Sequence, residues 1–82
     1  MVNVEVTDNA KNKAKGYQAL KQLYKQVGFL AQNPRHPSLK YQPLKSGKDI
    51  WKFRVTKHYW GLTIKVGSND LKVYDVIKHL PK

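Results

Sequence analysis

The chain has 82 residues, and its sixteen Lys and Arg against five Asp and Glu give a formal net charge of +11. This length fits a single small domain over residues 1–82 and excludes a second catalytic domain. The chain has no cysteine, which excludes disulfides, thiolate nucleophiles and cysteine-based zinc sites and favours a reducing compartment. A hydrophobic fraction of 40%, with two Trp and five Tyr, predicts a folded chain rather than a basic tail.

The charge predicts a polyanionic partner. Nucleic acid is favoured because neutralising phosphates releases counterions. From charge alone, an anionic membrane surface and an acidic protein are the lesser alternatives. The sequence has no apolar run long enough to span a bilayer, and its first residues lack the basic then apolar order of a signal peptide. We therefore expect a cytoplasmic protein without a membrane partner.

The first third of the chain predicts a short strand followed by helix. Residues 2–6 alternate apolar and polar side chains, and Thr7 or Asp8 can cap a helix. Helical spacing then continues to Gln32, where Asn33-Pro34 ends it. Gly16 leaves two possibilities, one bent helix or a helical hairpin. The expected apolar face consists of Leu20, Leu23, Tyr24, Val27, Leu30 and Ala31, and the expected polar face of Lys21, Gln22, Lys25 and Gln26.

The second half of the chain predicts three strands. Residues 50–55 place Trp51, Phe53 and Val55 on one side and Lys52 and Arg54 on the other. Residues 59–66 alternate in the same way, with Trp60, Leu62, Ile64 and Val66 on the apolar side and Tyr59, Thr63 and Lys65 opposite. A turn at Gly67-Ser68-Asn69-Asp70 leads to residues 71–77, with Leu71, Val73 and Ile77 in phase and Lys72, Tyr74 and Lys78 opposite.

These elements predict an α+β fold. A small antiparallel sheet, made of the N-terminal strand and a C-terminal three-stranded meander, would pack against one or two N-terminal helices. The apolar sides of the strands would face the helices. The basic sides would face solvent or a polyanion.

The order of the motifs resembles the RelE/ParE toxin superfamily. After the helix come Asn-Pro-Arg-His-Pro-Ser-Leu-Lys-Tyr-Gln-Pro-Leu at 33–44, Ile-Trp-Lys-Phe-Arg-Val at 50–55, and Tyr59 opening the next strand. The resemblance covers most of the chain. It implies a toxin of a toxin–antitoxin pair, with an acidic antitoxin as partner. The toxin would be either a ribosome-dependent mRNA endonuclease that inhibits translation or, in the ParE branch, an inhibitor of DNA gyrase.

The resemblance also implies site residues. RNA cleavage without metal requires a positioned ribose, stabilisation of phosphorane charge and transfer of two protons. Lys52 and Arg54 match positions where RelE-type nucleases carry basic catalytic residues, and His79 is the candidate for proton transfer. No metal or other cofactor is expected, since the three histidines lack ligand spacing. The expected RNA-binding residues are Lys40, Lys45, Lys57 and Lys78 for flanking phosphates and Tyr59 and Tyr74 for stacking on bases.

The chain departs from the family pattern at two places. The arginine that usually follows the strand-opening tyrosine is Trp60, which strand phase assigns to the apolar side. Beyond the last strand, His79 is the only candidate acid or base. These departures keep two alternatives to the nuclease open: a catalytically inactive module that binds RNA or antitoxin, and a gyrase inhibitor.

Overall fold

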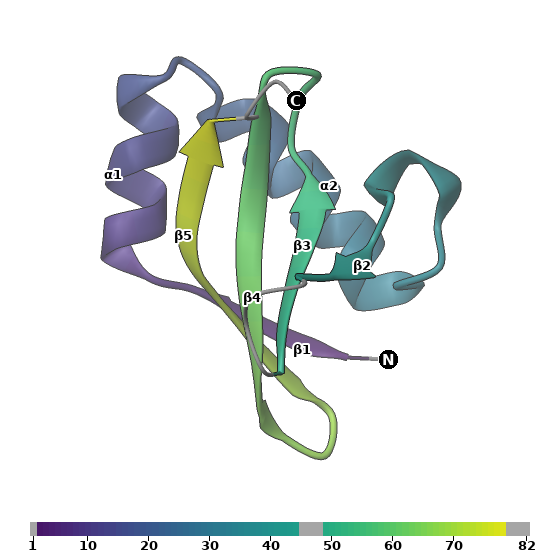
Figure 1. The fold of residues 1–82 in the computed structure, drawn as a ribbon. Coiled ribbons are helices and arrows are strands. Elements are labelled where there is room, and N and C mark those ends of the chain that lie inside the picture. The colour runs from purple at the N-terminus through teal and green to yellow at the C-terminus, as the bar shows by residue number, and fades with distance from the viewer. Residues whose placement is uncertain (1, 45–48, 79–82) are drawn as a thin grey trace.

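A computed structural model describes residues 2–44 and 49–78, which form two α-helices, one short 3-10 helix and a five-stranded sheet (Figure 1). The sheet order is β1-β5-β4-β3-β2. The α+β class and the antiparallel β3–β4–β5 meander confirm the prediction. The strands are β1 (Asn3–Val6), β2 (Gln42–Pro43), β3 (Ile50–Arg54), β4 (Tyr59–Gly67) and β5 (Asp70–Lys78).

The N-terminal strand differs from the prediction in its direction. β1 pairs with β5 in parallel, with Val4 opposite Leu71 and Val6 opposite Val73. Parallel neighbours need a crossover connection, and the helices between β1 and the meander provide it. The sheet is therefore mixed rather than antiparallel.

The helical segment forms a hairpin of α1 (Asp8–Gly16) and α2 (Leu20–Gln32). The Thr7 hydroxyl caps α1 by accepting the Ala10 N–H at 3.2 Å, as predicted. The break falls at Gln18, which has a left-handed φ of 58°, whereas Gly16 has no positive φ. α2 ends before Asn33-Pro34, also as predicted. Among the described residues, neither helix has the length and apolar character needed to cross a membrane.

The helices cover one face of the sheet, here called the inner face. Leu23 and Leu30 of α2 pack there with Phe53, Val73 and other fully buried side chains, among them Ala10, Ala14, Leu39 and Val76. Figure 1 views the sheet from its other side, with α2 behind the strands and α1 beside β5. The opposite face, called the outer face below, is therefore left open by the helices.

Two residues of α2 are on the other side of the helix from the predicted one. Tyr24 is 47% exposed, whereas Gln26 is only 7% exposed. The Gln26 amide donates to the backbone carbonyls of Ser38 at 3.2 Å and Arg54 at 2.7 Å. These two bonds offset the cost of burying a polar side chain. Gln26 thus ties the 3-10 turn η1 (Pro37–Leu39) to the end of β3.

A β-bulge shifts the predicted phase of β5. Leu62 pairs with Asp75 and Thr63 pairs with Val73, so Tyr74 is an extra residue with no partner of its own in the register. The bulge brings Val76 into the core in place of Ile77. The prediction that Leu71, Val73 and Ile77 share one face is therefore wrong at Ile77.

Candidate functional site

The outer face of the sheet carries both predicted basic catalytic residues. Lys52 pairs across the strands with Leu62, and Arg54 pairs with Trp60. Directly opposed residues point to the same face of a sheet. The neighbouring Phe53 is fully buried on the inner face, so alternation places Lys52 and Arg54 together on the outer one. Their predicted position is confirmed, and both are half-buried.

Trp60 lies between these cations and forms part of an apolar floor. The Lys52 ammonium sits 4.6 Å from the centroid of the Trp60 ring, a cation–π contact of about 0.5–2 kcal/mol. Trp60 is 7% exposed and Leu62 is 9% exposed, although neither belongs to the core beneath the helices. The outer face is thus an apolar surface with cations above it, and the ring limits where the Lys52 ammonium can go.

The structure reverses the predicted phase of β4. Trp60, Leu62 and Ile64 lie on the outer face, and Gly61 and Thr63 lie on the inner face. Gly61 is required there because a Cβ would lie 2.5 Å from Phe53 Cε1. The fully buried Thr63 hydroxyl donates to the Trp51 carbonyl at 3.1 Å and shares a hydrogen bond with the Tyr41 hydroxyl at 3.3 Å. Phe53 packs on Gly61 and Tyr41 contacts Thr63, so the inner side of β4 is covered by side chains from other elements. The apolar residues of β4 line the outer face instead.

Tyr59 therefore does not lie on the basic face. Its ring stacks on Tyr17 with centroids 4.3 Å apart and packs against the helix-side core. Lys78 pairs directly with Tyr59, so it too points to the helix side, at the exposed end of β5. The predicted placement of these two residues beside Lys52 and Arg54 is wrong. Lys45 and His79 lie outside the described residues.

Asp75 lies on the β5 side of the outer face, since it pairs with Leu62, and the bulged Tyr74 precedes it. Burial, and secondarily the negative charge of Asp75, raises the pKa of Tyr74 above its usual 10.0. Asp75 forms an ion pair with Lys13 of α1 at 2.8 Å, and this hydrogen bond is the main reason that the pKa of Lys13 is raised. Because Tyr74 is the bulged residue, strand alternation does not assign its ring to a face. The Asp75 carboxylate is neutralised from α1.

The outer-face cations have no acidic partner in the described part of the chain. Among the described residues, no carboxylate lies within ion-pair distance of Lys52 or Arg54. Within the same part of the chain, no cluster of three or more His, Asp or Glu side chains could hold a metal ion. What this face offers chemically is therefore unneutralised positive charge on a rigid sheet.

A basic groove of about 450 Å³ lies between the end of β3, at Arg54, and α2. Lys25, Lys40 and Lys57 line it together with Arg54, and none of its lining residues is acidic. Lys40 has a left-handed φ of 48° at the end of η1. We call this the edge groove. The structure thus places two of the predicted phosphate-binding residues, Lys40 and Lys57, in one groove. Lys25 was predicted on the polar face of the helix and was not among the predicted RNA-binding residues, because a lysine there looks like part of an ordinary solvated helix face.

Solved structures of other proteins share this architecture over nearly the whole chain. A metal-bound toxin from Helicobacter pylori is 29% identical, with a TM-score of 0.74 over 96% of both chains. A YoeB/ParE toxin from Agrobacterium tumefaciens is 17% identical, with a TM-score of 0.74 over 96% of this chain and 100% of that one. This chain has the RelE/ParE fold. No protein-family model and no curated protein matches its sequence.

The RelE/ParE fold also occurs in a toxin–antitoxin complex that matches this chain. It is the heterotetrameric YoeB–YefM complex from Staphylococcus aureus, 17% identical with a TM-score of 0.70 over 98% of this chain and 99% of that chain. In this chain, the residue after the strand-opening Tyr59 points to the outer face, since Trp60 pairs with Arg54. The departure from the family pattern at Trp60 therefore falls inside the candidate site and not in the core.

Proposed function

We propose that this chain is the toxin of a toxin–antitoxin pair and that it cleaves messenger RNA on the ribosome without a metal ion, in the cytoplasm. The observation that carries the proposal is the pair Lys52 and Arg54 on the open sheet face, with no carboxylate to neutralise them. The RelE/ParE fold and the 29% identity to a toxin support it. So does the net charge of +11, which suits RNA and an acidic antitoxin.

In the proposed reaction, the ribose 2′-oxygen attacks the neighbouring phosphorus and the bond to the 5′-oxygen breaks. One proton leaves the 2′-hydroxyl and one reaches the departing 5′-oxygen. Lys52 and Arg54 bind the phosphate and stabilise the charge that develops on its oxygens. Trp60 is a positioning residue that holds the Lys52 ammonium over its ring. His79 is proposed to transfer one of the two protons.

The edge groove is proposed to bind flanking RNA. Arg54 belongs both to the outer face and to this groove, so an RNA strand that leaves the scissile position past Arg54 meets Lys40 and Lys57 next. Phosphate contacts of this kind add affinity without sequence preference. Lys45 and Lys78 are proposed to contact more distant phosphates and Tyr74 to contact a base. Tyr59 is no longer a candidate for stacking on a base, because its ring already stacks on the Tyr17 ring.

Trp60 favours a second candidate function, a catalytically inactive module that binds RNA or antitoxin. The family pattern has an arginine at this position, and its replacement removes one cation from the outer face. Charge stabilisation would then rest on Lys52 and Arg54 alone. Such a module would keep the RNA contacts of this face without cleaving.

Induced expression in a bacterium separates these functions. Growth arrest with cuts in translated messages supports the proposal, whereas broken chromosomal DNA indicates gyrase inhibition and normal growth indicates the binding module. The double variant Lys52→Ala/Arg54→Ala should restore growth at unchanged protein level and circular dichroism. The matched control, Lys11→Ala/Lys15→Ala, removes two charges from α1 and should arrest growth like the wild type. Full toxicity of the first variant would refute the assigned site.

A further inference from the structure

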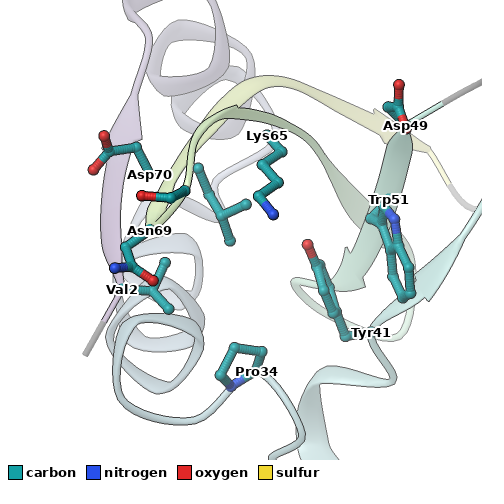
Figure 2. Close-up of a pocket in the computed structure, with 10 residues that line it drawn as sticks. Val2, Pro34, Tyr41, Asp49, Trp51, Lys65, Asn69 and Asp70 are labelled. Atoms are coloured by element: carbon teal, nitrogen blue, oxygen red, sulfur yellow. The ribbon is translucent and has the colours of Figure 1, made fainter.

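A cavity of about 340 Å³ lies on the inner face, beyond the end of α2 (Figure 2). Pro34 after α2, Val2 before β1 and Leu71 of β5 give it apolar walls, and Tyr41 and Trp51 form its aromatic side. A cavity of this volume is in the range that binds small ligands or large side chains. Because Trp51 alternates with Lys52 along β3, the cavity and the proposed RNA site lie on opposite faces of the sheet.

The aromatic side of the cavity is held rigidly. The Tyr41 and Trp51 rings stack with centroids 4.8 Å apart. The Tyr41 hydroxyl hydrogen-bonds to Thr63, whose own hydroxyl donates to the Trp51 carbonyl. Yet Trp51 is 38% exposed. A preformed aromatic surface that remains open lowers the entropic cost of binding, since little has to be ordered when a partner arrives.

The charge inside the cavity comes from Lys65. Figure 2 shows its amine pointing into the cavity toward Tyr41, while the carboxylates of Asp49 and Asp70 point away from it. The Asp70 carboxylate instead accepts a hydrogen bond from the Asn3 amide at 3.0 Å. In the part of the chain that the structure describes, Lys65 has no carboxylate partner. Lys65 is an exposed residue, so its ammonium is open to solvent in the free chain and available to pair with a carboxylate from a bound molecule.

We propose that this cavity anchors the acidic protein partner of the chain, by taking one apolar side chain between the aromatic wall and Leu71 and a neighbouring carboxylate on Lys65. The inference rests on the proposed function, which supplies the acidic antitoxin. Inside the cavity, Lys65 is the one cation among the described lining residues, and Asp49 and Asp70 lie at the rim, so a protein carboxylate fits this cavity better than a phosphate chain. The partner would then hold the toxin from the face opposite Lys52 and Arg54.

The two tryptophans make the test direct, since Trp51 lines the cavity and Trp60 lies on the outer face. In ¹⁵N-labelled full chain, the two indole N–H signals are followed by NMR during separate titrations to millimolar concentration. One probe is the peptide acetyl-Leu-Asp-Glu-Leu-amide, its control is acetyl-Leu-Asn-Gln-Leu-amide, and a third probe is a uridine hexanucleotide. The acidic peptide should shift the Trp51 signal and leave Trp60 unchanged.

The variant Lys65→Gln should weaken binding of the acidic peptide about tenfold, the value of one charge-assisted contact. The control Lys72→Gln removes a charge from the outer side of β5 and should leave the peptide affinity unchanged. The inference is overturned if the acidic peptide does not shift Trp51 or if both peptides shift it equally. RNA shifts at Trp60 and cuts in messages test the proposed function independently, so either idea can fail while the other stands.

Discussion

Loss of the outer-face cations should weaken RNA binding in a way that can be measured as a salt dependence. The perturbation is Lys52→Gln/Arg54→Gln, which keeps side-chain bulk and removes two charges that no described carboxylate neutralises. For single strands, the slope of log K against log salt is about −0.7 per neutralised phosphate. The double variant should therefore make this slope shallower by about 1.4. At about 1.5 kcal/mol for each charge-assisted contact, the affinity should fall about a hundredfold.

Fluorescence anisotropy of a labelled single-stranded RNA, titrated over a series of salt concentrations, measures both quantities. The control Lys11→Gln/Lys15→Gln removes the same net charge from α1. This helix packs beside β5, which β4 separates from β3. The control should keep the wild-type slope within experimental error. Equal losses in the two double variants would show that affinity follows net charge alone and would refute the assigned interface.

Three further predictions concern stability. Gly61→Ala should lower the free energy of unfolding by about 1–3 kcal/mol, because its methyl group would press on the Phe53 ring, and urea unfolding measures this loss. Gln26→Ala should cost about 1–3 kcal/mol in the same assay, since it removes two part-buried hydrogen bonds to the Ser38 and Arg54 carbonyls; an unchanged midpoint would contradict the role given to this amide. Folding raises the pKa values of Lys13 and Tyr74 above 10.5 and 10.0, so the native state binds more protons in alkali and stability should fall as the pH rises above 10. Tyr74→Phe should flatten that decline in thermal unfolding, and an equally steep decline would rule out a contribution from Tyr74.

Sequence patterns identified the elements of this fold but not the orientation of every strand. The cap at Thr7, the helix end before Asn33, the meander and the turn at residues 67–70 all follow from local chemistry. The period of two in β4 was also correct, but the side assigned to the core was not. Which side of β4 faces the core depends on the Phe53 ring, which fills the space beside Gly61, and on the Tyr41 hydroxyl, which hydrogen-bonds to Thr63. These are contacts between distant residues, which alternation within one strand does not contain.

The candidate site was predictable to the same extent. Lys52 and Arg54 alternate with a core residue, so their position on one open face follows from the sequence. Tyr59 was predicted on the basic face, and this was wrong because the phase of β4 is reversed. The edge groove and the Lys65 cavity were not predictable, because each collects side chains from several elements. A lysine such as Lys25 acquires its neighbours only when the helix packs beside the end of β3.

The most direct test of the proposed function is primer extension on a reporter message incubated with purified protein, with and without actively translating ribosomes. We expect cuts that require ribosomes, that persist in excess chelator, and that disappear with Lys52→Ala/Arg54→Ala while remaining with Lys11→Ala/Lys15→Ala. An intact message after incubation of the folded wild-type protein with translating ribosomes would contradict the nuclease function.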